Sequence, residues 1–406
     1  MVVFPETPAE VAAVLAFAAT QRLPVVPFGA GTSLEGHVIP VAGGITLSLA
    51  RMDRLLELRS DELNATVQPG LTRLALSSAA GERGLFFPVD PGADATLGGM
   101  AATNASGTTT VRYGGMRRNV LALQVALADG SLIRMGTRAA KSSAGYDLTS
   151  LFVGSEGTLG VITELTVRLY GLPDRVLAVR VTYRTLDDAC QAAAALVAAG
   201  APVARLELLD AATITAVNAY KGAEYPETPT LFLEVEGEDG DVRELCAGAL
   251  GYESDADPTG RARLWAARHH VLFALLAAAP GKVHKSTDVC VPVPALAQAV
   301  RHARTAVDAH GLQASIVAHA GDGNYHVLFM LDPASADELQ RAERLNDEIV
   351  DWALAHGGTC SGEHGIGLGK LGYLEREHGD LLPLMRGIKN LLDPAGILNP
   401  GKVMVQ

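Results

Sequence analysis

Apolar and polar residues alternate with helical spacing near the start of the chain. Thr7 is followed by Pro8 and Glu10, the spacing of a capping box with proline at the first helical position, so a helix is predicted here. Residues 23–28 then form a short apolar run that leads into a glycine-rich loop, which predicts a buried strand and a turn. The apolar face of the helix consists of Val11, Val14, Leu15 and Ala18.

In the second half of the chain, strand patterns alternate with alanine-rich helical patterns. Residues 176–183, 203–209 and 230–236 are predicted as strands. Ser335 and Glu338 have capping-box spacing and begin a helix predicted over residues 335–356. Its apolar stripe, which indicates packing on a core, consists of Leu339, Ala342, Leu345, Ile349 and Trp352.

A change of composition at residues 171–174, Gly-Leu-Pro-Asp, marks a predicted domain boundary. The chain has 406 residues, 48% of them hydrophobic, which is enough for two cores at ~100–200 residues per domain. We therefore predict two domains, residues 1–173 and 174–406.

Two further strands are predicted at residues 314–318 and 327–331, on either side of the sequence His-Ala-Gly-Asp-Gly-Asn-Tyr-His. The Gly-Asp-Gly-Asn segment supplies residues that tolerate positive φ, so the strands are expected to form a hairpin. His319 and His326 then lie where the strands meet the turn, close enough to bind one ion.

A carboxylate and a third imidazole follow between glycines, at Glu363 and His364. With His319 and His326, Glu363 makes a His₂Glu set of metal ligands, which leaves coordination positions open. This set suits zinc, and also manganese or iron, so the identity of the metal stays open. His364 is the spare base. Taken singly, a histidine is most often a surface or hydrogen-bonded residue and Asp322 a turn residue, but the whole cluster predicts a functional site.

Two glycine-rich loops occur in the first hundred residues. Residues 29–33, Gly-Ala-Gly-Thr-Ser, offer backbone N–H groups that suit a phosphate. Residues 91–99, followed by 104–107 and 113–115, are small enough to let the backbone approach a flat ligand. Ordinary turns are the alternative for either loop alone. Because position 34 is leucine, the G-x-G-x-x-G spacing is incomplete, and no P-loop motif occurs, which argues against Rossmann and P-loop folds.

The net charge of −12 argues against nucleic acid as a partner and against a basic membrane-binding patch. No apolar stretch approaches the ~20 residues that span a bilayer, and the start lacks a secretion signal, so a cytoplasmic protein is predicted, with peripheral membrane attachment left open. The four cysteines lack a C-x-x-C pattern and are predicted to be free thiols.

The glycine loops and the histidine cluster belong to a longer series of motifs. The series is Pro-Phe-Gly-Ala-Gly-Thr-Ser-Leu-Glu-Gly (27–36), Pro-Gly-Ala-Asp-Ala-Thr-Leu-Gly-Gly (91–99), Val-Gly-Ser-Glu-Gly-Thr-Leu-Gly-Val-Ile-Thr (153–163), Gly-Asp-Gly-Asn-Tyr-His (321–326), Ser-Gly-Glu-His-Gly-Ile-Gly (361–367) and Asp-Pro-Ala-Gly-Ile-Leu-Asn-Pro-Gly-Lys (393–402). Over essentially the whole chain it resembles the FAD-linked D-2-hydroxyacid dehydrogenases of the vanillyl-alcohol-oxidase superfamily. Residues 264–269 and 287–292 are more similar to the cytochrome-type D-lactate dehydrogenases than to the glycolate oxidase subunit or the D-2-hydroxyglutarate enzymes.

The resemblance implies an α+β fold with a PCMH-type FAD-binding domain and an α+β substrate domain. The tail, from about residue 367, is expected to return to the FAD-binding domain. The first loop would hold the FAD pyrophosphate, the second would lie along the ribityl chain and the isoalloxazine ring, and residues 156–162 would complete the pocket. The residues so assigned to FAD are Pro27, Gly29, Ala30, Gly31, Thr32, Ser33, Pro91, Gly92, Thr96, Gly98, Gly99, Asn104, Ser106, Gly107, Tyr113, Glu156, Gly157, Gly160, Ile162 and Asn399.

The resemblance also implies the chemistry, which is oxidation of a D-2-hydroxy acid, first of all D-lactate, with hydride transfer to the flavin N5. The metal would bind the substrate hydroxyl and one carboxylate oxygen, and His364 would accept the hydroxyl proton. Arg268 is predicted to grip the carboxylate, with a surface salt bridge as the alternative. Electrons would pass to a cytochrome, a quinone or an electron-transfer flavoprotein.

Two departures from the family pattern modify this picture. No histidine follows the glycines of the first loop directly, so non-covalent FAD is predicted, and His37 is taken as a surface or loop residue. Family members usually have further residues before the position of Val2, so a misassigned start and a trimmed start are both left open. Lys285 matches a substrate lysine of the hydroxyglutarate enzymes only after a shift in spacing. The oligomeric state stays open, a homodimer included.

Three alternative functions remain at this point. Besides oxidation of D-lactate, the chain could serve as a glycolate oxidase FAD subunit that needs partner chains or as a D-2-hydroxyglutarate dehydrogenase. The third alternative is a non-catalytic FAD- or metal-binding module. The last is disfavoured because a base, a metal set and a carboxylate-binding arginine are all present.

Overall fold

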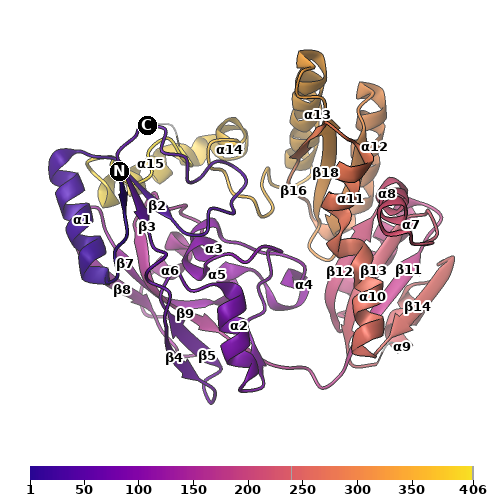
Figure 1. The fold of residues 1–406 in the computed structure, drawn as a ribbon, viewed down its shortest axis with the longest axis horizontal. Helices are drawn as coiled ribbons and strands as arrows, with labels where there is room; N and C mark the ends of the chain where they lie inside the picture. The colour runs from indigo at the N-terminus through magenta and orange to yellow at the C-terminus, as the bar shows by residue number, and fades with distance from the viewer. Residues whose placement is uncertain (239, 405–406) are drawn as a thin grey trace. The chain divides into compact units, whose positions relative to one another are not determined.

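The computed structural model describes residues 1–238 and 240–404 and contains two compact units (Figure 1). The first unit comprises Met1–Gly107, Tyr113–Leu172 and the segment from Glu363 onward. The second unit comprises Thr108–Arg112 and Pro173–Gly362. The first unit is therefore built from segments that are far apart in the sequence.

Two sheets form the framework of the first unit. A small parallel sheet has the strand order β1-β3-β2, and a larger antiparallel sheet has the order β4-β5-β9-β7-β8, with a separate β10-β6 pair. The end of β2 leads directly into the first glycine loop, as its apolar run predicted. The strands are β1 (Val2–Val3), β2 (Val25–Phe28), β3 (Ile45–Ser48), β4 (Leu55–Arg59), β5 (Asn64–Val67), β6 (Leu85–Phe86), β7 (Val120–Ala126), β8 (Leu132–Gly136), β9 (Val161–Arg168) and β10 (Tyr170–Gly171).

Helix α1 (Pro8–Gln21) confirms the predicted start signal. Thr7 caps the helix by accepting a hydrogen bond from the Glu10 N–H. The Glu10 carboxylate, however, accepts from the backbone N–H of Glu6 and not of Thr7, so the second half of the capping box is displaced by one residue. Val11, Leu15 and Ala18 are buried in a core shared with β3 and with Leu398 near the end of the chain.

Of the remaining helices of the N-terminal part, α2, α3, α5 and α6 contribute to the core of the larger sheet, whereas Thr110–Arg112 of α4 belong to the second unit. Leu76, Met100 and Phe152 are buried in one core with Leu165 of β9. Helix α3 begins inside the second glycine loop with Thr96 at its N-cap. The helices are α2 (Arg73–Gly81), α3 (Leu97–Thr103), α4 (Thr110–Tyr113), α5 (Met116–Asn119) and α6 (Leu148–Phe152).

The C-terminal segment contributes α14 (Leu371–His378) and α15 (Leu382–Leu392), drawn in yellow in Figure 1. Lys389 of α15 is buried, and its Nζ donates to the carbonyls of Thr158 and Leu398 and to the carboxylate of Asp393. Burial lowers the pKa of Lys389, against the effect of Asp393. The bond to Thr158 attaches the segment to the turn that precedes β9.

The second unit contains an eight-stranded antiparallel sheet. Its order is β14-β11-β13-β12-β17-β18-β15, with β16 also paired to β18. The strand predictions at 203–209 and 230–236 are confirmed by β12 and β13. The strands are β11 (Val176–Thr182), β12 (Val203–Leu209), β13 (Thr230–Glu236), β14 (Gly251–Asp255), β15 (Val283–Ser286), β16 (Val289–Cys290), β17 (Ala314–His319) and β18 (Asn324–Leu331).

Helices pack on this sheet through extensive apolar contacts. Trp265 of α10 and Val271 of α11 share a core with Phe232 and Val317 of the sheet. Helix α13 begins at the predicted cap, where Ser335 accepts from the Glu338 N–H. The helices are α7 (Leu186–Ala198), α8 (Ala211–Lys221), α9 (Gly240–Leu245), α10 (Pro258–His269), α11 (Val271–Ala278), α12 (Leu296–His310) and α13 (Ala336–Ala355).

The predicted hairpin is confirmed by β17 and β18, which pair antiparallel with His319 opposite Asn324 and Val317 opposite His326. Gly323 in the turn has φ 78°, which suits glycine. The cysteines Cys190, Cys246, Cys290 and Cys360 are free thiols. Within residues 1–238 and 240–404, no helix combines the length and the apolar character that crossing a membrane requires.

The buried lysine gives a test of how the C-terminal segment is attached. We expect Lys389→Met to lower the free energy of unfolding by about 3 kcal/mol, because the buried Asp393 carboxylate loses its counter-charge. Urea denaturation followed by circular dichroism measures this loss. The double variant Lys389→Met/Asp393→Asn should recover part of it, and an unchanged single variant would contradict the assignment.

Candidate functional site

The histidines of the hairpin lie on one face of the second-unit sheet. Side chains two residues apart on a strand point to the same face. His319 shares its face with Val317, and His326 shares its face with Leu328, and both of these apolar residues belong to the core beneath α10 and α11. The two imidazole rings are perpendicular, with centroids 5.6 Å apart.

A buried carboxylate lies on the neighbouring strand, opposite His319. Glu207 of β12 pairs with His319 of β17 in the register, and its side chain is fully buried. Glu207 Oε1 accepts from His319 Nδ1 at 2.6 Å and Oε2 accepts from Arg268 Nε at 2.7 Å. Although burial raises the pKa of Glu207, the charges of His319 and Arg268 outweigh it and lower that pKa to about 2. Glu207 is therefore an ionised group with a donor on each oxygen.

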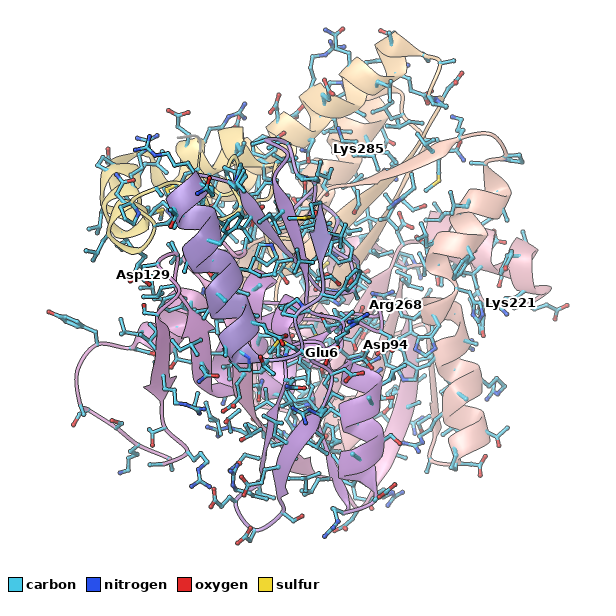
Figure 2. All side chains as sticks on the ribbon, turned by 60° about the vertical axis from the view of Figure 1, so that its left-hand side comes forward. Glu6, Asp94, Asp129, Lys221, Arg268 and Lys285 are labelled. Atoms are coloured by element: carbon cyan, nitrogen blue, oxygen red, sulfur yellow. The ribbon has the colours of Figure 1, made fainter. Side chains whose placement is uncertain are left out.

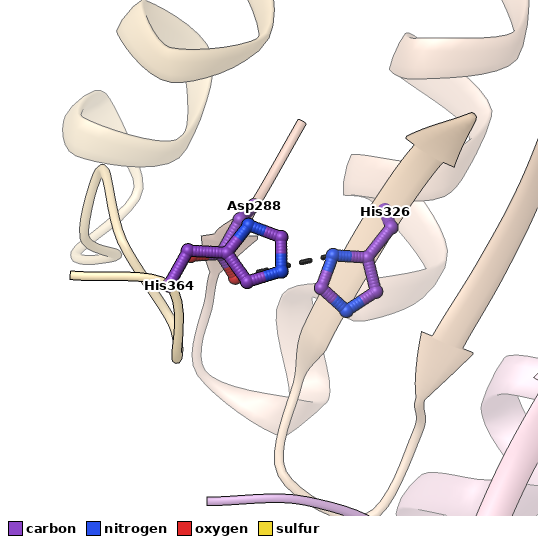
Figure 3. Close-up of side chains that lie close together, drawn as sticks. All are labelled: Asp288, His326 and His364. Atoms are coloured by element: carbon purple, nitrogen blue, oxygen red, sulfur yellow. Dashed lines mark ion pairs between the residues drawn. The ribbon is translucent and has the colours of Figure 1, made fainter. Parts of the chain in front are cut away.

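His326 is oriented in the same manner by a backbone acceptor. Its Nδ1 donates to the carbonyl of Thr287 at 3.0 Å and lies 3.9 Å from Asp288, as the dashed line in Figure 3 shows. When Nδ1 carries the proton of a neutral imidazole, the lone pair is on Nε2. His319 and His326 both use Nδ1 as the donor, so in the neutral form of either ring the lone pair lies on Nε2. This is the arrangement that metal-binding histidines need.

Asp288 connects the hairpin to the end of the second unit. Its carboxylate accepts from Asn324 Nδ2 at 2.9 Å and from Ser361 Oγ at 3.0 Å. Gly362 packs so tightly here that a Cβ would come within 2.0 Å of Asn324 Nδ2. The chain is thus fixed within the second unit up to the residue that precedes Glu363.

Arg268 and Lys285, labelled in Figure 2, differ in their surroundings. Arg268 on α10 is 22% exposed in its side chain, and its Nε is bound to Glu207, so it is neither a solvated surface residue nor an isolated one. Lys285 is exposed on β15. Sequence reasoning missed Glu207, because a glutamate within an apolar strand gives no local sign of its partners.

A further histidine was also missed. His284 of β15 pairs with Met330, and burial, together with the neighbouring His326, lowers its pKa and favours the neutral ring. Its Nε2 is buried and has no hydrogen-bond partner among the described residues. Only its position three residues before the 287–292 motif could have pointed to it.

The first unit contains a cavity lined by the glycine loops. Its empty volume is about 1300 Å³, open solvent included. Glu363 and His364 line the same cavity. The predicted cofactor residues that line it are Pro27, Gly29, Ala30, Gly31, Thr32, Ser33, Pro91, Thr96, Gly98, Gly99, Ser106, Glu156, Gly157, Gly160, Ile162 and Asn399.

Close backbone approaches and unpaired hydroxyls mark the cavity wall. A Cβ on Gly29 would come within 2.3 Å of Thr96 Oγ1, and one on Gly98 would come within 2.4 Å of Pro69 Cβ. The hydroxyls of Ser33 and Thr96 are buried without a hydrogen-bond partner in the described part of the chain. Buried hydroxyls normally have partners, so these two fit a bound group with oxygen acceptors, such as the FAD phosphates.

Four residues assigned to FAD lie outside this cavity and have other contacts. Asn104 ends α3 with φ 51°, and its Oδ1 accepts from the Arg117 N–H. Tyr113 packs edge-on against Phe86 and Tyr170. Two glycines complete the set: Gly107 has φ 151° and packs on the Asp90 carbonyl, and Gly92 has φ 82° with open space around it.

The loop that carries Glu363 and His364 is attached to the cavity wall. Glu363 Oε2 accepts from Ser106 Oγ at 3.2 Å, and His364 Nδ1 lies 3.9 Å from Glu35 Oε1. His37 is 4% exposed, so the prediction of a surface residue was wrong, although it does lie in a loop. Its ring is buried against Glu156, with 3.2 Å between Nε2 and Oε2.

Comparison with known proteins agrees with these features. Residues 172–403 match the family model of the FAD linked oxidases, C-terminal domain, and residues 1–136 match that of the FAD binding domain. The chain is 44% identical to a probable mitochondrial D-lactate dehydrogenase of Danio rerio, covering 100% of this chain and 84% of that protein. It is 42% identical to the mitochondrial D-lactate dehydrogenase [cytochrome] of Arabidopsis thaliana, covering 100% and 73%. It is 34% identical to the glycolate oxidase subunit GlcD of Bacillus subtilis, covering 100% and 89%.

Solved structures confirm the predicted fold class. A 4-ethylphenol oxidase from Gulosibacter chungangensis superposes with a TM-score of 0.77 at 18% identity, covering 99% of this chain and 88% of that one. An alkyldihydroxyacetonephosphate synthase gives a TM-score of 0.76 at 18% identity, covering 98% and 75%. At this identity the likeness concerns the fold alone.

The depressed pKa of Glu207 predicts a pH-dependent stability. A carboxyl group whose pKa falls from 4.5 to about 2 on folding adds stability above pH 4.5 that is lost as the pH drops towards 2. We expect Glu207→Gln to cost about 3 kcal/mol of unfolding free energy at pH 7, and less at pH 3. Urea titrations at both pH values measure this difference.

Glu234→Gln is the matched control, because Glu234 on β13 forms a half-exposed ion pair with Arg205 at 3.1 Å. It should cost less than about 1 kcal/mol. If both variants lose the same stability, or if the loss for Glu207→Gln does not shrink at pH 3, the assignment is refuted.

Proposed function

Because this chain belongs to the family of FAD-linked oxidases and is an FAD-dependent oxidoreductase, we propose that it oxidises D-lactate, or a closely related D-2-hydroxy acid, to the 2-oxo acid. The observation that carries this proposal is the cavity of the first unit, where Glu363 and His364 line the same space as the glycine loops. The D-lactate dehydrogenases among the full-length relatives support the choice of substrate.

The first unit would hold FAD without a covalent bond. The backbone of Gly29 to Ser33 and the hydroxyls of Ser33 and Thr96 suit the phosphates, because they present N–H and O–H donors into the cavity. Gly98 and Gly99 allow the start of α3 to approach the ligand closely. When bound there, FAD would supply a flavin N5 able to take the hydride from the substrate Cα.

His364 is our choice for the general base. It lines the cavity, and its ring is partly enclosed, with 13% of the side chain exposed. The carboxylate of Glu35 near its Nδ1 can orient the ring and stabilise the imidazolium that forms when the substrate hydroxyl gives up its proton. Oxidation then removes one hydride and one proton, which leaves the 2-oxo acid.

We further propose that His319, His326 and Glu363 hold a divalent metal, zinc or manganese, with iron as the third choice. The Nδ1 bonds to Glu207 and to Thr287 fit this role, because they turn Nε2 of each histidine into the ligand atom. Glu363 follows Gly362 directly in the chain, and Gly362 packs against Asn324. Asn324 lies two residues before His326 on β18. A metal held by these residues would lower the pKa of the substrate hydroxyl and fix the carboxylate.

Arg268 has two tasks in this proposal. Its Nε holds Glu207 and thereby the tautomer of His319, and its terminal N–H groups are assigned to the substrate carboxylate. A cytochrome is the proposed electron acceptor, because mitochondrial relatives carry the name D-lactate dehydrogenase [cytochrome].

The function can be tested by anaerobic mixing of the FAD-loaded enzyme with D-lactate. We expect rapid loss of the oxidised-flavin absorbance, slower loss with glycolate and D-2-hydroxyglutarate, and none with L-lactate. Faster reduction by glycolate would favour the glycolate oxidase alternative. A flavin that none of these acids reduces would refute the proposed oxidation.

The variant His364→Asn isolates the base within the same experiment. It should keep the flavin spectrum of the wild type and reduce the flavin ~10²–10⁴-fold more slowly, the range expected for loss of a general base. A variant with the wild-type rate would remove His364 from the reaction.

Metal removal tests the ligand set separately. After dialysis against a chelator, we expect retained FAD but loss of flavin reduction, with recovery when Zn²⁺ or Mn²⁺ is added back. Elemental analysis should find about one ion per chain before dialysis and none afterwards. Full activity in a preparation shown to be metal-free would contradict the proposed site.

A further inference from the structure

The carboxylate of Glu156 binds the backbone of the loop that follows His364. The Ile366 N–H donates to Oε1 at 2.7 Å and the Gly367 N–H donates to Oε2 at 2.8 Å, so each oxygen has its own main-chain partner. His37 Nε2 lies 3.2 Å from Oε2, and both side chains are at most 5% exposed. Hydrogen bonds to an ionised acceptor are roughly twice as strong as neutral ones.

The backbone of Glu156 is itself fixed on both sides. Its φ of 53° lies in the left-handed region, at a cost of ~1–3 kcal/mol for a residue other than glycine. Its N–H donates to the Ala102 carbonyl at 2.8 Å, and its carbonyl accepts from Asn399 Nδ2 at 2.7 Å. A strained backbone with two anchoring hydrogen bonds gives the carboxylate one direction.

Gly365 shows how closely the loop approaches this carboxylate. It has φ 79°, and a Cβ there would lie 2.7 Å from Glu156 Oε1 and 2.7 Å from His37 Nε2. The residue after His364 therefore has to be glycine for the two hydrogen bonds to form.

Glu35, at the end of the first glycine loop, contacts the same segment further along. Its carbonyl accepts from the Leu368 N–H at 2.7 Å and the Gly369 N–H at 3.3 Å, and its carboxylate lies 3.7 Å from Lys370 Nζ. The loop after His364 is thus bound by residues from two of the predicted FAD-binding segments.

We propose that Glu156 is a positioning residue, whose carboxylate fixes the loop carrying His364 beside the cofactor cavity, and that it is not an FAD contact through its side chain. This inference rests on the proposed role of His364 as the base. Both carboxylate oxygens already accept main-chain hydrogen bonds from residues 366 and 367, which accounts for a glutamate at a position where the backbone favours glycine.

The test uses the FAD-loaded full chain with Glu156→Gln. Glutamine has one oxygen and one NH₂ group in place of the two carboxylate oxygens. The NH₂ group would face one of the two main-chain N–H donors, so that hydrogen bond is lost. We expect the peptide spanning residues 362–371 to exchange its amide hydrogens about tenfold faster, and flavin reduction by D-lactate to slow at least about tenfold with KM and FAD occupancy unchanged. Hydrogen-exchange mass spectrometry and stopped-flow absorbance give the two readouts.

Two further variants sharpen the result. Glu164→Gln, on β9 and paired with Arg134 at 2.8 Å, is the matched control and should change neither readout. Gly365→Ala disturbs the same contact from the other partner and should reproduce the faster exchange even if Glu156→Gln folds poorly.

The inference is overturned if Glu156→Gln loses FAD while residues 362–371 exchange as in the wild type, because Glu156 would then be a cofactor contact. It is also overturned if neither variant changes the exchange. Failure of the proposed function has a different signature, since D-lactate would then not reduce the flavin of the wild type, whatever the exchange rates show.

Discussion

Buried hydrogen bonds between the C-terminal segment and the rest of the first unit are the interaction on which the structure depends. Lys389 donates to Thr158, Asn399 donates to Glu156, and the backbone at Ile366 donates to the Glu156 carboxylate. Without these bonds the cavity would lack Asn399, Glu363 and His364. Placement of the loop that carries His364 therefore depends on the same buried polar groups that attach the C-terminal segment.

Each unit contains a buried carboxylate whose two oxygens both accept a hydrogen bond. Glu207 accepts hydrogen bonds from His319 and Arg268, and Glu156 accepts them from two main-chain N–H groups. A buried charge is costly unless it is fully paired, so such groups stabilise the fold weakly but fix geometry well. In the second unit the carboxylate orients the imidazole of His319, and in the first unit it holds the loop that carries His364. These are histidines to which the proposed function assigns a role.

Local patterns in the sequence predicted much of this architecture. The spacing of apolar residues gave β12, β13 and the start of α13, and the Gly-Asp-Gly turn gave the β17–β18 hairpin. The sequence did not reveal Glu207, because its partner His319 is 112 residues away, nor the burial of His37. Asn104 and Tyr113 were assigned to the cofactor by their place in a motif, but side-chain packing gives them other contacts. Pairing over such distances is decided by the folded sheet and not by neighbours in the sequence.

The division of the first unit between distant parts of the chain also has a consequence for biosynthesis. A ribosome makes Met1–Leu172 first, then the whole of Pro173–Gly362, and only then the segment from Glu363 onward. Domains tend to fold as they emerge, the N-terminal one first. Here that early domain has to wait, with part of its core uncovered, until the segment from Glu363 onward is translated, so a nascent chain cannot complete the cavity before that segment has been made.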